Sequence, residues 1–393
     1  MKHPRIILKK GREIALRYGH PWIFSGAIAT IEGKPEPGEV VTAVDASGRE
    51  LGLGFYNRGD IAFRLLTGDP AAAIDAGFWR RRIERALALR RRVIPPGTDA
   101  FRLINAEGDG MPGLVCDRYG GHLVITIGTA GMEKCRETVA GLLLEIATPV
   151  GIFERSEGRS RRMEGLFDRV GPVAGDIPGV VVIEERGLHF EVDLITGQKT
   201  GFFLDQRDNR ELAGAYCRGA AVLNCFSYTG AFSVYAARGR AERVVSVEAS
   251  EPANEVARRN LQRNGFSPER HPVHTADVFD YLRETREMFD LIILDPPAFA
   301  KSRRDVERSV RGYKEINLQG ARRLREGGLL ATFSCSNPID PELFEKIVLG
   351  ALRDAGKTAQ LLGRLGPGMD HPVNLAHPEG RYLKGLLLAL HSS

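Results

Sequence analysis

The sequence has few cysteines and no long apolar run. Its five cysteines lie at positions 116, 135, 217, 225 and 335, an odd number with no Cys-x-x-Cys pair. This spacing argues against a disulfide scaffold or zinc ribbon and predicts no metal centre and a reducing, cytoplasmic location. No apolar stretch approaches the roughly 20 residues that cross a bilayer. Residues 1–22 also lack the apolar core of a secretory signal, so no membrane partner is expected.

The composition shows neither a shortage of hydrophobic residues nor a strong charge of one sign. Of the 393 residues, 43% are hydrophobic and 27% are charged, which argues against a disordered or fibrous chain. The length suggests about two to three domains of roughly 150 residues. The formal net charge of +5 fits a nucleic-acid partner but does not demand one.

The basic residues concentrate in one segment. Residues 79–93 contain seven arginines and a single glutamate, and apolar residues recur there near helical spacing. The pattern predicts a helix with one packed stripe and a cationic remainder. The arginines either form a solvated helix face or contact phosphates, which guanidinium groups bind in a bidentate manner.

Short strands are expected before this helix and mixed structure after it. Apolar or alternating runs at 40–44, 51–56 and 61–66 are separated by glycine-containing turns, which predicts a small β-barrel. Further along the chain we expect strands within 113–121 and at 122–128, a helix over 132–146, and a hairpin of 180–184 with 188–194.

From about residue 219 the pattern changes to strands that alternate with helices. Short apolar runs at 221–225, 244–247, 291–294 and 329–333 are typical of buried parallel strands. The segments between them are long enough for crossover helices, which predicts an open, doubly wound α/β domain. Ligands of such domains bind beyond the C-terminal ends of the strands.

The first of these strands leads into Phe226-Ser227-Tyr228-Thr229-Gly230, which has a single glycine. The Gly-x-Gly-x-x-Gly fingerprint is missing at this strand end, which weighs against NAD and FAD. Glu248 ends the second strand, where a carboxylate accepts hydrogen bonds from ribose hydroxyls or simply faces solvent. Asp277 either binds an adenine amino group or caps the next helix. Together with the turn, the two acids indicate adenosine binding.

The next two strand ends carry reactive or rigid groups. Asp295-Pro296-Pro297 follows the strand at 291–294, and the two prolines fix the backbone and remove donors. Cys335 follows the strand at 329–333 at the same predicted sheet edge, which makes it a candidate nucleophile. The other cysteines are interpreted as structural thiols, except Cys225, which lines or packs against the cofactor.

Together, these motifs resemble the class I S-adenosylmethionine-dependent methyltransferases. More closely, the chain resembles bacterial large-subunit ribosomal RNA cytosine-C5 methyltransferases with an N-terminal PUA domain. The resemblance covers almost the whole chain: His20 to Phe24, Thr196 to Arg207, Phe226 to Gly230, Asp295 to Pro297, Ser334 to Ser336 and Tyr382 to Lys384 match the family in order. It implies a PUA-like domain at 1–72, a central α+β domain at 73–195 and a Rossmann-like methyltransferase domain at 196–393.

The resemblance also assigns roles to residues. It implies that Cys335 is the nucleophile and that Asp295 faces both the methyl donor and the base. The residues that it implies for S-adenosyl-L-methionine are Lys199, Thr200, Gln206, Phe226, Ser227, Tyr228, Gly230, Glu248, Asp277, Val278, Asp295 and Pro296. Those that we expect to contact ribosomal RNA are Arg80, Arg81, Arg82, Arg90, Arg91, Lys301 and Arg303. A homodimer is plausible.

The expected product is 5-methylcytosine in large-subunit ribosomal RNA, formed through a Cys335 adduct. Many related RNA enzymes use a second cysteine after the Asp-Pro or Pro-Pro step, and this chain has Ala298 there. Product release must therefore depend on another group. Two alternatives remain open: an RNA N-methyltransferase for guanine or adenine that uses Asp-Pro-Pro without an adduct, and a non-catalytic ribosome assembly factor.

Overall fold

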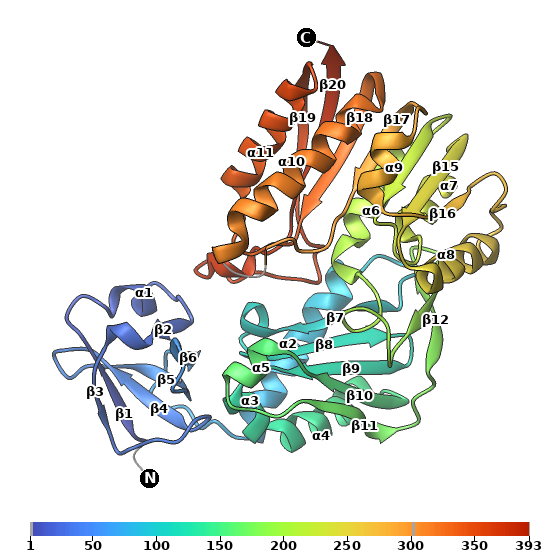
Figure 1. Ribbon diagram of the computed structural model, residues 1–393. Coiled ribbons are helices and arrows are strands. Elements are labelled where there is room, and N and C mark those ends of the chain that lie inside the picture. The colour runs from blue at the N-terminus through green and yellow to red at the C-terminus, as the bar shows by residue number, and fades with distance from the viewer. Residues whose placement is uncertain (1–2, 301–302, 393) are drawn as a thin grey trace. The chain divides into compact units, whose positions relative to one another are not determined.

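The computed structural model describes residues 3–300 and 303–392 (Figure 1). Contacts divide the chain into two compact units. The first unit comprises residues 1–183, 192–202 and 369–380, and the second comprises 184–191, 203–368 and 381–393. Each unit has its own sheets and its own hydrophobic core.

The first sheet of the first unit is a small, mostly antiparallel sheet with strand order β2-β6-β5-β4-β1-β3. Its strands are β1 (Arg5–Leu8), β2 (Trp22–Phe24), β3 (Ile28–Glu32), β4 (Val40–Val44), β5 (Glu50–Tyr56) and β6 (Ile61–Thr67), with the short helices α1 (Ile14–Arg17) and η1 (Ser25–Ala27) between them. The core of this sheet is built on side chains such as Ile6, Val41 and Phe63, which are fully buried. The strands expected at 40–44, 51–56 and 61–66 are therefore confirmed.

The second sheet of this unit has the order β11-β10-β9-β8-β7. Its strands are β7 (Ala100–Asn105), β8 (Leu114–Tyr119), β9 (His122–Ile127), β10 (Gly151–Ser156) and β11 (Arg169–Gly175), and the neighbouring helices are α2 (Ala76–Val93), η2 (Ala106–Asp109), α3 (Ala130–Lys134), α4 (Arg136–Ala147) and α5 (Arg159–Met163). Helix α2 begins where the Asp75 carboxylate accepts a 2.8 Å hydrogen bond from the Phe78 amide. Its apolar stripe, including Trp79 and Ile83, packs into the core of the sheet.

The helix expected over 132–146 is two helices. Cys135 separates α3 from α4, and its amide donates to the Met132 carbonyl at 3.0 Å, three residues back. This tight 3₁₀-type turn interrupts the α-helical ladder, which the apolar periodicity alone did not show. The expected hairpin is β12 (Val180–Glu185) with β13 (Leu188–Asp193), joined by Arg186 and Gly187, both at positive φ.

The second unit is built on a sheet of order β16-β15-β14-β17-β18-β20-β19. Its strands are β14 (Ala221–Cys225), β15 (Arg243–Glu248), β16 (Val273–Thr275), β17 (Phe289–Leu294), β18 (Leu324–Ser334), β19 (Lys357–Leu365) and β20 (Lys384–Ser392). Strands β14 to β18 run parallel, and β20 is antiparallel to both β18 and β19. The strands expected at 221–225, 244–247, 291–294 and 329–333 are β14, β15, β17 and β18 and are confirmed, whereas β16, β19 and β20 were not predicted.

Helices cover both faces of this sheet (Figure 1). The helical segments are η3 (Leu204–Gln206), α6 (Arg207–Ala215), α7 (Ala231–Arg238), α8 (Glu251–Arg263), α9 (Val278–Glu284), η4 (Arg303–Asp305), α10 (Val306–Arg322) and α11 (Pro341–Asp354). The short η5 (Pro378–Gly380) belongs to the first unit. Side chains of α9, α10 and α11 pack in one core cluster, whereas those of α6 and α7 pack in another. The mixed α/β class with a Rossmann-like, doubly wound sheet is therefore as expected. Among the described residues, no helix is both long and apolar enough to cross a membrane.

Candidate active site

The predicted strand-end residues lie at the C-terminal ends of parallel strands in the seven-stranded sheet of the second unit. Strands β15, β14, β17 and β18 are parallel neighbours, so their C-terminal ends meet at the same edge. Glu248 is the last residue of β15, and the turn at 226–230 follows β14. Asp295 follows β17, and Cys335 follows β18. The topology therefore brings together the residues that the sequence placed at strand ends.

The turn after β14 holds an unusual backbone. Phe226 and Tyr228 have φ values of 59° and 45°, and Gly230 has a φ of 78°. Each non-glycine residue in this left-handed region costs on the order of 1 kcal/mol or more. A Cβ on Gly230 would lie 2.9 Å from the Cβ of Ala257, so close packing against α8 also favours glycine. Such strain is typical of ligand-binding turns.

Two hydroxyl groups in this turn test whether it can hold a polar ligand. Within the described part of the chain, Ser227 Oγ and Thr229 Oγ1 are buried without a hydrogen-bond partner. Buried polar atoms normally have partners, and an orphaned group costs free energy. The two hydroxyls at the start of α7 therefore fit a cofactor with polar groups of its own.

The carboxylate of Glu248 accepts a backbone hydrogen bond from the same turn. Its Oε2 accepts a 3.1 Å hydrogen bond from the Tyr228 amide, and Oε1 accepts one of 3.1 Å from the Ser250 amide. Each oxygen has a further lone pair, so these bonds leave capacity for the ribose hydroxyls expected there. The side chain is half-buried, and the backbone at both strand ends fixes its position.

Asp277 performs the capping role that the sequence left open. Its Oδ1 accepts hydrogen bonds from the amides of Phe279 at 2.8 Å and Asp280 at 3.1 Å, at the start of α9. The next residue, Val278, is buried in the core beside the sheet. The capping bonds use one carboxylate oxygen, and contact with an adenine amino group stays a prediction for this residue.

The ends of β17 and β18 bring the reactive groups close together. In the register between these strands, Leu294 pairs with Thr332, which places Asp295 and Cys335 beyond neighbouring strand ends. The Cys335 Sγ lies 4.0 Å from the carbonyl oxygen of Pro296. Both Cys335 and Asp295 are half-buried, so neither is closed off in the core.

The segment around Cys335 is held by polar contacts on both sides. Ser336 Oγ accepts a 3.2 Å hydrogen bond from the Ala300 amide and lies 2.8 Å from the hydroxyl of Tyr313 on α10. On the other side, Lys384 Nζ donates to the Ser336 carbonyl at 2.6 Å. These contacts fix the backbone on which the thiol is presented.

Burial raises the thiol pKa of the four cysteines other than Cys335. Cys116, Cys217 and Cys225 are buried, and desolvation raises their pKa values, that of Cys217 to about 12. Cys135 is half-buried, and desolvation raises its pKa to about 11. The alternatives for Cys225 were lining and packing, and its place in the main core cluster favours packing. These four thiols are therefore poor nucleophiles at neutral pH.

Sequence reasoning missed the role of Lys384, the first residue of β20. It appeared there only as part of a matching motif, although its side chain is buried next to the Cys335 segment. Burial lowers the pKa of Lys384 to about 8, while the charge of Cys335 acts in the opposite direction. The apolar run that follows it, Leu386 to Leu390, was the available signal for a buried strand.

Three further predicted cofactor residues lie before β14. Gln206, in η3, is buried and its Oε1 accepts a 2.6 Å hydrogen bond from Asn209 Nδ2. Lys199 and Thr200 belong to the first unit. Thr200 is buried there, and its hydroxyl donates to Asp117 Oδ2 at 2.6 Å, so it helps to hold the interior of that unit. Cofactor contact by these residues stays a prediction.

The predicted RNA-binding arginines of α2 divide into two groups. Arg81 and Arg91 are exposed, and Arg80 is half-buried and paired with Glu145. Arg82 is half-buried and donates to the carbonyls of Leu66 and Gly110. Lys301 lies outside the described residues, and Arg303 begins η4.

The RNA-binding prediction is wrong for Arg90. Its side chain is 0% exposed and forms a bidentate pair with Asp109, with both N–O distances at 2.7 Å. It also donates to the carbonyls of Arg102 and Asp370. The arginine count suggested a uniformly cationic surface, but helical geometry turns this residue into the interior of the unit.

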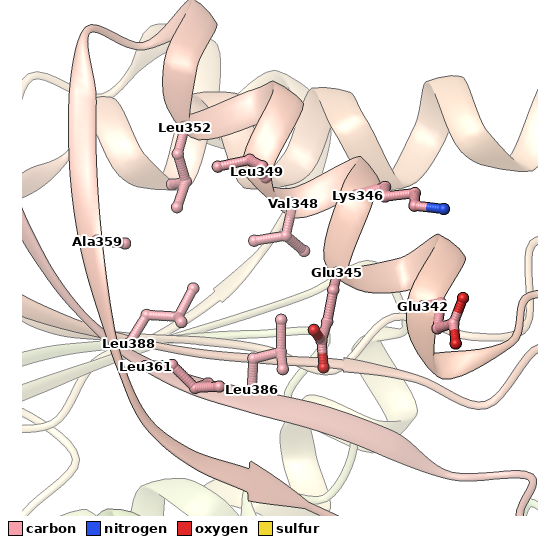
Figure 2. A pocket seen from close by; sticks show the side chains of 10 residues that line it. All are labelled: Glu342, Glu345, Lys346, Val348, Leu349, Leu352, Ala359, Leu361, Leu386 and Leu388. Atoms are coloured by element: carbon pink, nitrogen blue, oxygen red, sulfur yellow. The ribbon is translucent and has the colours of Figure 1, made fainter.

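A separate apolar cavity of about 460 Å³ lies on the outer part of the second unit's sheet (Figure 2). Leucines of α11, including Leu349 and Leu352, face Leu361 of β19 and Leu388 of β20. The predicted site residues do not contribute to its lining. The cavity is therefore distinct from the strand-end site.

Comparisons with known proteins agree with this architecture. A family model described as a PUA-like domain matches residues 6–68, and one described as an S-adenosylmethionine-dependent methyltransferase matches residues 169–357. Among solved structures, SMU.776 in complex with SAH aligns with a TM-score of 0.85 at 23% identity, covering 99% of this chain and 100% of that chain. That likeness shows the fold.

Two curated relatives are similar over almost their whole length. Ribosomal RNA large subunit methyltransferase I of Alteromonas mediterranea is 42% identical over 388 residues, covering 98% of each chain. The protein of the same name from Shewanella amazonensis is 44% identical over 389 residues with the same coverage. The fold, the site and these matches define an S-adenosylmethionine-dependent methyltransferase with an N-terminal PUA-like domain. The chain belongs to the ribosomal RNA large subunit methyltransferase I family, and its cofactor is S-adenosyl-L-methionine, as expected.

Proposed function

We propose that this enzyme methylates C5 of a cytosine in large-subunit ribosomal RNA and that Cys335 is its nucleophile. The observation that carries the proposal is the position of the half-buried Cys335 just after β18, with its Sγ 4.0 Å from the Pro296 carbonyl oxygen and one strand from Asp295. The names of the relatives support ribosomal RNA as the substrate class.

The chemistry of cytosine explains why a thiol is needed. C5 is a poor nucleophile, so the Cys335 thiolate first adds to C6, forming a carbon–sulfur bond and moving electron density to C5. S-adenosylmethionine, when bound, supplies an electrophilic methyl group for that carbon. A base then takes the C5 proton, the C5–C6 double bond forms again, and the carbon–sulfur bond breaks to return the thiolate.

Asp295 is proposed to orient the base. A carboxylate at this strand end accepts a hydrogen bond from the exocyclic amine of cytosine, which fixes C6 toward the thiol. The following prolines, Pro296 and Pro297, restrict the backbone and hold the carboxylate in place. This arrangement reduces the entropy lost when base and thiol are aligned.

The cofactor is proposed to lie over the turn after β14. The hydroxyls of Ser227 and Thr229, which have no hydrogen-bond partner among the described residues, support this position, as does the spare hydrogen-bonding capacity of Glu248. The remaining residues proposed to contact it are Lys199, Thr200, Gln206, Phe226, Tyr228, Gly230, Asp277, Val278, Asp295 and Pro296.

RNA contacts are proposed for the PUA-like domain and for the exposed part of α2. The target base must leave its stack before C6 is accessible, which costs a few kcal/mol. Exposed arginines such as Arg81 and Arg91 are proposed to contact the phosphates of the RNA backbone, and the binding free energy from neutralising these phosphates offsets the cost. The proposed boundaries remain 1–72 for the PUA-like domain, 73–195 for the central domain and 196–393 for the methyltransferase domain.

The environment of Phe299 weighs against methylation of a ring or exocyclic nitrogen. Such an enzyme uses an aromatic ring after Asp-Pro-Pro to stack on its base. Here the Phe299 ring packs against Tyr313 with centroids 4.8 Å apart, and it also contacts Phe226 and Phe279. These contacts tie the ring to neighbouring side chains and favour a structural role.

The experiment compares Cys335→Ala with the wild-type enzyme and with Cys135→Ala. Transfer of a labelled methyl group to ribosomal RNA that lacks the modification is measured, and calorimetry measures cofactor binding. We expect Cys335→Ala to lose turnover and bind the cofactor normally, while Cys135→Ala retains both. Undiminished methylation by Cys335→Ala would support nitrogen chemistry. If the wild-type chain bound RNA but not the cofactor, it would instead be an assembly factor.

A further inference from the structure

Lys384 is a buried lysine beside the proposed nucleophile. It begins β20 and pairs with Ser334, the last residue of β18, in the antiparallel register of the two strands. Its side chain is only 7% exposed. Lysine is rarely buried to this degree, because removing its charge from water is costly unless a specific interaction compensates.

The hydrogen bonds of Lys384 fix its ammonium group next to the Cys335 segment. Nζ donates to the Ser336 carbonyl at 2.6 Å and to the Tyr382 carbonyl at 2.9 Å. Ser334 and Ser336 flank Cys335, so the strand register and the bond to Ser336 place the ammonium group at the Cys335 segment, where it interacts electrostatically with Cys335. A lysine whose only role was solubility would point outward.

Other ionisable groups face this region from the neighbouring elements. Asp340 caps α11 through a 2.8 Å hydrogen bond from the Leu343 amide and interacts electrostatically with Lys384. The Tyr313 hydroxyl, from α10, lies 2.8 Å from Ser336 Oγ, and burial raises its pKa, so it stays neutral. Asp295 follows the adjacent strand β17. Among these described groups Lys384 is the cation, and Arg364 and Arg381 line a pocket together with it, where Arg364 is paired with Glu345.

We propose that Lys384 is a positioning residue that holds the Cys335 segment and stabilises the Cys335 thiolate with its positive charge. This inference rests on the proposed role of Cys335 as the nucleophile. A free thiol with a pKa near 8.5 is only a few per cent thiolate at neutral pH, and an adjacent cation increases that fraction. The proton that leaves the thiol goes to solvent, and Lys384 remains protonated throughout.

The charge state of Lys384 agrees with this role. Burial lowers the pKa of Lys384 to about 8, and interaction with Cys335 raises it. The ammonium form therefore predominates at pH 7, where the thiolate is needed. Deprotonation of the thiol and retention of the Lys384 proton are mutually favourable, as in other coupled thiolate–cation pairs.

The test is the pH dependence of Cys335 alkylation by iodoacetamide, measured on the full-length enzyme without RNA or cofactor. Mass spectrometry of the Cys335 peptide gives the rate at each pH. We expect the midpoint of the rate against pH to lie below 8.5 for the wild type. The midpoint should be higher by roughly one pH unit for Lys384→Met, and that of Lys384→Arg should stay near the wild-type value. At pH 7, Lys384→Met should react roughly tenfold more slowly.

Cys135, with a pKa raised to about 11 by burial, is the internal control, and its profile should not respond to the Lys384 variants. An equal midpoint in wild type and Lys384→Met would overturn the inference. A wild-type midpoint at or above 8.5 would do so without any variant, so a misfolded variant does not prevent the test. Because alkylation requires no turnover, failure of the Cys335→Ala methylation test would reject the proposed function separately.

Discussion

Single residues at the turn after β14 combine local strain with unsatisfied polar groups. Phe226 and Tyr228 adopt left-handed backbone conformations that are unfavourable for their side chains, while Ser227 and Thr229 bury hydroxyls without partners in the described chain. Both features lower stability unless a ligand compensates. Both features therefore support the proposal that the turn is a preorganised cofactor site.

Replacing Gly230 with alanine tests whether this glycine is needed for cofactor binding, beyond the stability cost of a side chain at positive φ. Gly230 has a φ of 78°, and an added Cβ would lie 2.9 Å from the Cβ of Ala257. Gly219 has a similar φ of 70° with open space around it, so Gly219→Ala is the matched control. The positive φ alone should lower the unfolding free energy in urea by about 1 kcal/mol in both variants, and Gly230→Ala should lose more because its Cβ crowds Ala257. Only Gly230→Ala should bind S-adenosylmethionine more weakly in calorimetry, and equal affinities would contradict the assignment.

The lowered pKa of Lys384 predicts that the stability of the protein depends on pH. Its pKa is lowered by burial from 10.5 to about 8, so between these values the unfolded chain binds more protons than the folded one. Stability of the wild type relative to Lys384→Met should therefore rise with pH across this window, by on the order of 2 kcal/mol. Urea unfolding of both proteins at pH 7 and pH 10 measures the difference. A constant difference would show that Lys384 does not titrate as a buried group.

The sequence predicted some of these residues and missed others for a physical reason. Cys335 and Asp295 each follow a strong apolar run, so their strand-end positions were apparent. Lys384 comes close to the Cys335 segment through the antiparallel pairing of β18 with β20 and the bond to the Ser336 carbonyl, neither of which local sequence patterns specify. Arg90 was misassigned because an arginine count does not show which side of a helix faces the core.

At the scale of elements, α2 has a structural face and a solvent face. Arg90 is buried and paired with Asp109, whereas Arg91, the next residue, is exposed. The helix was predicted within residues 79–93 and extends over Ala76–Val93. Its role in RNA binding therefore depends on the exposed positions alone.

Arg90→Met and Arg91→Met should affect different properties, the first stability and the second RNA binding. Arg90→Met leaves the buried Asp109 carboxylate without its charged partner and should lower unfolding free energy by about 3–5 kcal/mol. Arg91→Met should leave stability unchanged within about 0.5 kcal/mol. It should weaken RNA binding and reduce the slope of the logarithm of RNA affinity against the logarithm of salt concentration by about one. Thermal unfolding and salt titrations of RNA affinity measure the two effects. Normal stability of Arg90→Met would show that the buried pair contributes little.

At the scale of the whole molecule, the chain returns to its first unit after most of the second is complete. Residues 369–380 belong to the first unit although β14 to β19 precede them. Within that unit, the buried Asp370 carboxylate accepts a 2.8 Å hydrogen bond from the Arg102 amide, and its main-chain oxygen accepts from Arg90. The alternation of strands and helices predicted the doubly wound sheet, but composition did not indicate this return.

Asp370→Ala tests the contribution of the returning segment. Loss of the carboxylate removes the hydrogen bond that it accepts from the half-buried Arg102 amide, which should lower unfolding free energy by about 1–3 kcal/mol. Leu375→Ala, at an exposed position of the same segment, is the control and should have little effect. Equal stability of the two variants in urea would show that the segment is not fastened through Asp370.

The most direct test of the central claim uses RNA in which the target cytosine carries fluorine at C5. A base cannot remove fluorine from C5 as it removes the proton, so the carbon–sulfur bond cannot break. The enzyme should therefore remain attached to the methylated base through Cys335. In the presence of S-adenosylmethionine, intact-mass measurement should give the mass of enzyme plus methylated RNA, with the linkage on the Cys335 peptide and none for Cys335→Ala. Absence of that adduct, under conditions in which the unfluorinated RNA is methylated, would contradict the account.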